Sequence, residues 1–200
     1  MMRKCIFVIG PESSGSMLIA KICSHVLGIH EYGTWDGVAW SDKGEHKVCH
    51  RSLPYGSKPP KFPNIEHWIS QNEESYEVYF ILTTRDITIS ELSRFYRFLK
   101  PLKQSQKESE KARDIMTMII NSKYKHFIWS YETFMFLKKE YLNCLYKFLD
   151  MESEFIPNIV DSNSSKVAKL SIGKAAMSIF IKLEAKIKNL FMSILEQEPT

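Results

Sequence analysis

A glycine-containing loop near the amino terminus has the residue types that bind anions. In the segment CIFVIGPESSGSMLIAK, residues 5–21, Gly10 ends an apolar run and Gly15 opens a helix-like stretch. Backbone N–H groups at such a strand–loop–helix junction converge near the positive end of the helix dipole, where they bind phosphate or sulfate. We therefore expect an anion-binding loop formed by Ser13, Ser14, Gly15, Ser16 and Met17.

The same loop departs from the loops that bind nucleoside triphosphates. Those loops carry Lys-Ser or Lys-Thr directly after the second glycine, and the lysine grips the β- and γ-phosphates. Here Ser16 and Met17 follow Gly15, so the sequence favours another anion over ATP or GTP. An ordinary strand-to-helix turn is the alternative. The Glu12 carboxylate opposes anion binding, and we expect it to turn away and pair with an arginine or to cap backbone N–H groups.

An arginine and a serine follow the clearest of the later strand patterns. The run EVYFILTT, residues 77–84, is typical of a buried strand, and Arg85 comes directly after it. The carboxyl ends of strands in α/β sheets line the crevice in which ligands bind. Ser93 follows eight residues later, about two turns along a helix. We expect Arg85 and Ser93 to hold one phosphate together.

His50 is the candidate proton acceptor. It follows the short strand-like run HKVC and precedes the proline-rich connector RSLPYGSKPPKFP, which would hold it firmly. An imidazole is suited to removing a proton near neutral pH. A structural or surface histidine is the alternative interpretation. The neighbouring Arg51 adds a planar guanidinium that can grip two oxygens of an anion at once.

In this order and spacing, the segments resemble the sulfotransferases that use 3′-phosphoadenosine 5′-phosphosulfate. PESSGSM at 11–17 is similar to their Pro-Lys-Ser-Gly-Thr-Thr loop, and Arg85 and Ser93 match the spacing of their 3′-phosphate-binding pair. VCHRSLP at 48–54 is similar to their His-x-Leu-Pro element, and SYE at 130–132 to their Tyr-Glu step. The resemblance spans residues 5 to about 150, and the residues GPESSG and HRSLP resemble a divergent bacterial or phage branch of the family.

The resemblance implies a co-substrate, an acceptor and a role for each candidate residue. The 5′-phosphosulfate would lie on residues 13–17, the 3′-phosphate on Arg85 and Ser93, and His50 would be the general base. The acceptor would be a glycan or a small hydroxylated molecule, and no metal would be required. Ser13 replaces the lysine that stabilises the leaving phosphate in the family. We expect Arg51 to supply that charge, ahead of Lys58 and Lys61 of the connector.

Alternating strand and helix patterns must position these residues. Strand patterns cover residues 4–9, 46–50, 77–84 and 125–129, and helix patterns cover 16–28, 64–72, 86–99, 105–122 and 133–149. The alternation predicts an α/β fold, a three-layer P-loop-like domain with a mainly parallel central sheet. We expect one domain over residues 1–200, with its core in about 1–150 and a helical C-terminal extension over 151–200.

The amino-acid composition limits the classes of binding partner and the cellular location that we expect. The formal net charge of +4 suits a small polyanion such as a nucleotide and is too modest to indicate nucleic-acid binding. The cysteines form no CxxC pair, so we expect reduced thiols and a cytoplasmic protein. No stretch approaches the ~20 apolar residues of a membrane span. The apolar stripe Ile179, Leu183 and Ile187 predicts a helix that packs on the domain, with peripheral membrane contact as the alternative.

Two other functions stay open at this point. A small P-loop kinase would share the fold, although the missing Gly-Lys-Ser/Thr and the Arg85–Ser93 pair count against it. A catalytically silent nucleotide-binding module is favoured by Ser13 in the lysine's place.

Overall fold

The computed structural model describes residues 3–29, 38–40, 45–56, 59–159 and 161–163, with the backbone alone for 38–40. The chain divides into two compact units, residues 1–159 and 160–200. All the elements below belong to the first unit. The predicted C-terminal helix, with Ile179, Leu183 and Ile187, lies outside the described residues, as does Lys58.

Strands and helices alternate along the first unit. The strands are β1 (Lys4–Pro11), β2 (Val38–Trp40), β3 (His46–Leu53), β4 (Glu77–Thr84) and β5 (Lys125–Ser130). The helices are α1 (Ser16–Val26), α2 (Ile65–Ser70), α3 (Ile87–Phe98), α4 (Leu102–Ile120), α5 (Tyr131–Leu137) and α6 (Lys139–Phe148).

The central sheet has the strand order β2-β3-β1-β4-β5. The four longer strands are parallel, and only the short edge strand β2 runs antiparallel, against β3. β1 therefore lies inside the sheet, with β3 and β4 as its neighbours, and Val8 pairs in register with both His50 and Ile81. This order brings the carboxyl ends of β1, β3 and β4 to one edge, as the sequence led us to expect.

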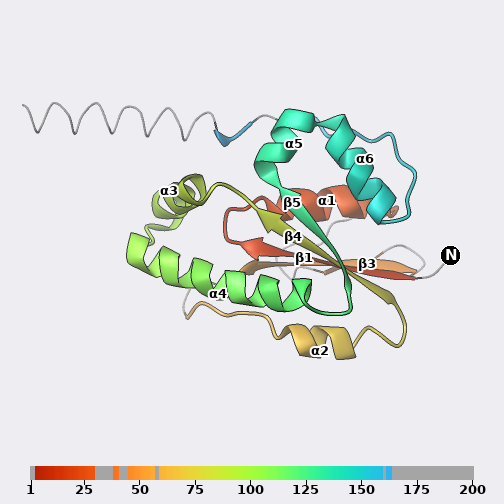
Figure 1. The fold of residues 1–200 in the computed structure, drawn as a ribbon, viewed down its shortest axis with the longest axis horizontal. Helices are drawn as coiled ribbons and strands as arrows, with labels where there is room; N and C mark the ends of the chain where they lie inside the picture. The colour runs from red at the N-terminus through yellow and green to blue at the C-terminus, as the bar shows by residue number, and fades with distance from the viewer. Residues whose placement is uncertain (1–2, 30–37, 41–44, 57–58, 160, 164–200) are drawn as a thin grey trace, which may run out of the picture. The chain divides into compact units, whose positions relative to one another are not determined.

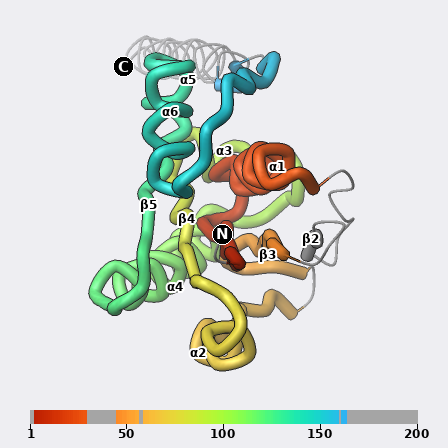
Figure 2. Tube along the Cα trace, turned by 90° about the vertical axis from the view of Figure 1, so that its right-hand side faces the viewer, coloured from red at the N-terminus to blue at the C-terminus, as the bar shows by residue number. Residues whose placement is uncertain are grey.

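Helices cover both faces of the sheet. Figure 1 shows α1, α5 and α6 over one face and α2 and α4 over the other, and Figure 2 shows the same layers from the side. Side chains alternate between the two cores along β1: Ile6 and Val8 join one apolar cluster, whereas Cys5, Phe7 and Ile9 join the other. Both faces of the strand are thus buried, which explains why its sequence is a continuous apolar run. The α/β expectation is confirmed.

One predicted helix is divided in two. The apolar period over 133–149 predicts a continuous helix, but α5 ends at Leu137 and α6 begins at Lys139. Lys138 between them has φ 47° and ψ −110°, a conformation outside the right-handed helical region that cannot continue the helix. The short strand β2 lies between α1 and β3 in the sequence. Asn64 is the N-cap of α2, and its side chain accepts a hydrogen bond from the His67 N–H.

Candidate functional site

The loop between β1 and α1 is a tight turn with two left-handed residues. Ser13 has φ 70° and Gly15 has φ 91°, and Gly15 is the N-cap of α1. The Ser14 N–H donates to the Pro11 carbonyl at 3.0 Å, which closes the turn. The Ser14 hydroxyl lies 2.6 Å from that of Thr83 in β4, so the loop is fixed to the neighbouring strand.

Two glycines allow the close approaches that this geometry needs. A Cβ at Gly10 would lie 2.1 Å from the Thr83 hydroxyl and 2.4 Å from the Thr83 carbonyl oxygen. A Cβ at Gly15 would meet the Tyr131 ring at 3.3 Å, in a backbone conformation that L-residues rarely adopt. Glycine at both positions is therefore required by the packing of the loop.

The amino end of α1 presents hydrogen-bond donors above this loop. The first intrahelical hydrogen bonds are donated by the Leu18 and Ile19 N–H groups to the Gly15 carbonyl. The Ser16 and Met17 N–H groups therefore come before the first hydrogen bond within the helix. Met17 is exposed. The Ser13 hydroxyl is buried and has no hydrogen-bond partner among the described residues. A buried polar group without a partner is costly, and a bound anion would supply its missing acceptor.

His50 is held against the same helix end. It lies in β3, almost fully buried, and its Nε2 is 2.9 Å from the Ser16 hydroxyl. Burial, followed by the nearby Arg51 charge, lowers the pKa of His50 to about 4. The imidazole is therefore neutral near pH 7, the state in which a histidine accepts a proton.

Arg51 is adjacent to His50 but is oriented differently. Its Nη1 donates to the His50 backbone carbonyl at 3.2 Å, and its guanidinium lies over the Tyr55 ring at 5.2 Å. Because consecutive side chains of a strand point to opposite faces, β3 turns Arg51 away from the face on which His50 meets Ser16. The structure thus brings His50 and Ser16 together, while Arg51 contacts the His50 carbonyl and its charge acts on the imidazole.

Arg85 lies beside the loop, at the carboxyl end of β4. Its Nη1 donates to the Ser13 carbonyl at 3.1 Å, and its guanidinium lies 4.4 Å from the centre of the Tyr131 ring. Arg85 and Gly15 therefore share one aromatic neighbour, Tyr131, which belongs to the predicted Tyr-Glu step. Ser93 lies farther along α3, on the face of that helix which is buried.

A largely buried network of charges includes Glu12 of the loop. Lys100 Nζ lies 2.6 Å from the Glu12 carboxylate and 2.8 Å from that of Glu108. Glu12 turns away as expected, but its partner is a lysine and not an arginine. Arg94, fully buried, donates to the Ser105 carbonyl and the Ser109 hydroxyl. Sequence reasoning missed Lys100, because only the fold brings residues 12 and 100 together.

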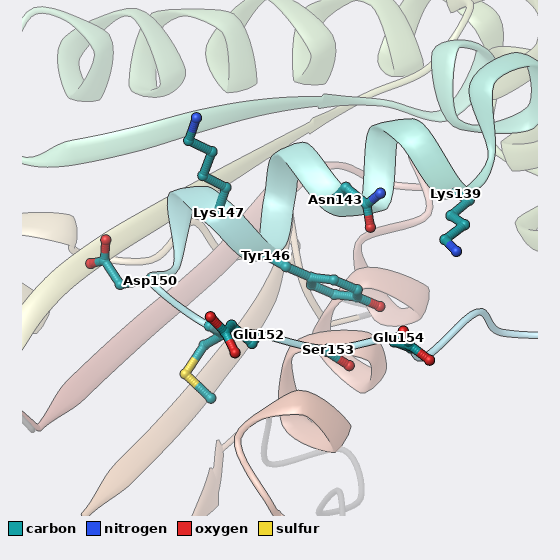
Figure 3. Close-up of a pocket in the computed structure, with 9 residues that line it drawn as sticks. Lys139, Asn143, Tyr146, Lys147, Asp150, Glu152, Ser153 and Glu154 are labelled. Atoms are coloured by element: carbon teal, nitrogen blue, oxygen red, sulfur yellow. The ribbon is translucent and has the colours of Figure 1, made fainter.

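A cavity of about 840 Å³ lies elsewhere, along α6 and the segment that follows it. Figure 3 shows its side chains: Lys139, Asn143, Tyr146 and Lys147 come from α6, and Asp150, Glu152, Ser153 and Glu154 come from the segment. Asp150 pairs with Lys4, at the start of β1, at 3.4 Å. The cavity shares no residue with the loop, and its mixed charges indicate no particular ligand.

Two general features of the described part of the chain bear on the site. Within the described ranges, no group of three or more His, Cys, Asp or Glu side chains could hold a metal ion. Among the same residues, no helix combines the length and the apolar character needed to cross a membrane.

Comparison with known proteins yields no relative. No protein-family model, curated protein or solved structure matches this chain.

Proposed function

We propose that this chain is a sulfotransferase. It transfers a sulfuryl group from 3′-phosphoadenosine 5′-phosphosulfate to a hydroxyl or amine of a glycan or a small acceptor. The observation that carries the proposal is the 2.9 Å contact between His50 Nε2 and the Ser16 hydroxyl at the amino end of α1. It joins a neutral proton acceptor to an anion-binding helix terminus, and sulfuryl transfer needs both of these parts.

The loop is suited to the donor's phosphosulfate. The Ser16 and Met17 N–H groups and the buried Ser13 hydroxyl offer donors to anionic oxygens at the positive end of α1. Donors fixed in advance stabilise the charge that develops on the leaving phosphate without reorganising. The resemblance of PESSGSM to the sulfotransferase loop supports the same assignment.

The transfer step can be written in terms of these residues. A lone pair of the acceptor oxygen attacks the sulfur in line, the bond between the sulfur and the bridging phosphate oxygen breaks, and adenosine 3′,5′-bisphosphate leaves. The acceptor's proton passes to His50 Nε2. A bound polyanion favours the imidazolium, so donor binding raises the pKa of His50 from its value of about 4 and makes it a stronger base.

Two guanidinium groups compete for the role of the missing loop lysine. Arg51 is the cation expected from the sequence, and its Nη1 contacts the His50 carbonyl. Arg85 contacts the loop itself, since its Nη1 donates to the carbonyl of Ser13, the residue that stands in the lysine's place. We assign to Arg85 the donor's 3′-phosphate, with Ser93 as its expected partner, and keep Arg51 for the leaving phosphate near His50.

A second candidate function has one observation in its favour. His50 is almost fully buried, and its Nε2 already has a partner within the protein. A histidine in that position can serve the fold alone, which is what a catalytically silent nucleotide-binding module would show. In that case the loop would bind the nucleotide and no transfer would follow.

Transfer of radiolabelled sulfuryl to a panel of glycans and phenols separates the two candidates. For the sulfotransferase we expect product with the wild type and a loss of about 10²- to 10⁴-fold with His50→Gln. The matched control is His67→Gln, because His67 is exposed on α2. Bisphosphate binding without any product would favour the silent module, and product at the wild-type rate with His50→Gln would refute the assigned base.

A further inference from the structure

The corner between α3 and α4 carries an unusual exposed apolar surface. Residues 94–103 read RFYRFLKPLK, and we call this segment the corner. Its large apolar side chains are exposed to solvent: Phe95, Tyr96, Phe98, Leu99 and Leu102. Figure 1 shows that the corner lies at an end of the layer formed by α4. Isolated exposed apolar residues are normal on soluble proteins, but five exposed aromatic and leucine side chains within ten consecutive residues are unusual.

Leu99 is the most informative member of the corner. It is 80% exposed and has φ 52°, ψ 35° as the C-cap of α3. The left-handed conformation at a helix end is the position that favours glycine or asparagine. A leucine here is strained and buries little apolar surface in return, so the fold itself does not explain its presence. A role in contact with something outside the domain does.

The charges of the corner identify the surface that it would meet. Residues 94–103 include no Asp or Glu. Arg94 is buried and Lys100 is paired with Glu12 and Glu108, which leaves Arg97 and Lys103, both exposed, among the apolar side chains. The Arg97 guanidinium lies 5.1 Å from the centre of the Phe98 ring. Cations interleaved with aromatics and leucines complement an interface that is apolar inside and anionic outside.

We propose that the corner is a membrane-docking surface for anionic lipid, in which Phe95, Phe98, Leu99 and Leu102 enter the interface while Arg97 and Lys103 meet lipid phosphates. Lys100 joins the corner to Glu12 of the anion-binding loop by a 2.6 Å contact. Docking would therefore hold the loop near the lipid surface. The proposal does not depend on sulfuryl transfer, and it concerns a different surface from the C-terminal stripe considered in the sequence.

Co-sedimentation with vesicles tests the proposal directly. Vesicles of phosphatidylcholine with about one third phosphatidylglycerol should bind the wild type, and pure phosphatidylcholine should bind it much less. Arg97→Gln/Lys103→Gln should weaken binding by about 25-fold, at about fivefold for each cation. The matched control is Lys139→Gln/Lys147→Gln on α6, which removes two exposed cations outside the corner and should change binding little.

The apolar part is tested with a variant that does not endanger the fold. Leu99→Asn suits the left-handed backbone, so its melting temperature should stay equal to or above that of the wild type while vesicle binding falls at least threefold. Phe98→Ser should lower binding similarly, whereas Phe136→Ser, at an 85% exposed position on α5, should not. Equal binding to anionic and neutral vesicles would overturn the proposal. So would concentration-dependent dimerisation in ultracentrifugation that Leu99→Asn abolishes, because the corner would then bind a second copy.

Discussion

The Ser16 hydroxyl and His50 Nε2 lie 2.9 Å apart, although 34 residues separate them in the chain. The contact links the first residue of α1 to β3, the strand that pairs in parallel with β1. A buried imidazole is thereby held at the terminus of a helix that begins directly after a glycine loop.

The stability of the fold should depend on the protonation of His50. Its pKa is about 4 in the folded chain and near the ordinary 6.5 in the unfolded chain, so the unfolded state binds the proton first as the pH falls. Stability contributed by the neutral imidazole is complete above about pH 6.5 and declines toward pH 4, by about 3 kcal/mol. Urea unfolding at several pH values checks this.

The control for that titration is His50→Gln, whose amide can still meet the Ser16 hydroxyl but does not titrate. The difference in unfolding free energy between wild type and variant should shrink or reverse from pH 6.5 to pH 4. A difference that is flat over this range would show that His50 titrates normally.

The pH–rate profile should show the titration of the same group, the His50 imidazole. If His50 is the base, kcat/KM should fall on the acid side with the pKa of the free protein, about 4. The acid limb of kcat should lie at higher pH, because bound donor anions stabilise the imidazolium. Steady-state rates between pH 3.5 and 8 with saturating and limiting donor distinguish the two limbs. Coincident limbs near 6.5 would point to a different, solvated base.

Gly10 should tolerate no side chain. Gly10→Ala would place a methyl group within 2.4 Å of the Thr83 carbonyl, a backbone atom that cannot move aside cheaply. We expect a loss of about 3 kcal/mol or more in the free energy of unfolding. Gly28→Ala is the matched control: its φ is 67° but its Cβ would meet nothing within 4 Å, so only the conformational cost of about 1 kcal/mol applies. Similar losses in the two variants would contradict the close approach.

Lys100 should be essential to the charge network beneath the loop. Lys100→Met would leave two largely buried carboxylates, Glu12 and Glu108, without their cation. We expect a loss of about 2–4 kcal/mol in the free energy of unfolding. Adding Glu12→Gln to that variant should recover part of it, and denaturant unfolding of the series measures the coupling. Lys123→Met, which removes an exposed pair with Glu73, should cost under about 1 kcal/mol.

Much of the fold could be predicted, because buried parallel strands have a distinctive sequence. EVYFILTT predicts β4 over the residues it occupies. β1 is longer than predicted, since Gly10 and Pro11 continue the pairing with Ser52 and Leu53 of β3. The break at Lys138 was not predictable from the apolar period, which continues through it. It depends on the backbone conformation of one residue.

For the candidate site, too, the local features could be predicted from the sequence and the long-range contacts could not. The loop and its glycines could be recognised locally, and the structure confirms a turn that leads into α1. The residue that each side chain contacts could not be predicted locally. His50 meets Ser16 because of the β1–β3 register, and Arg85 meets Ser13 because β4 lies beside β1. The role of Arg51 in place of the missing lysine stays a prediction, since the alternation of β3 turns its side chain to the other face while its Nη1 contacts the His50 carbonyl.

Calorimetric titration with adenosine 3′,5′-bisphosphate measures whether the loop and Arg85 form the donor site. The proteins compared are the wild type, Arg85→Ala and the control Arg113→Ala, a substitution on the exposed face of α4. We predict that wild type and Arg113→Ala bind the bisphosphate, that Arg85→Ala loses about 10- to 100-fold in affinity, and that ATP with magnesium binds more weakly. Absence of bisphosphate binding would contradict the sulfotransferase assignment. A preference for ATP with magnesium would contradict it too and would favour a small P-loop kinase.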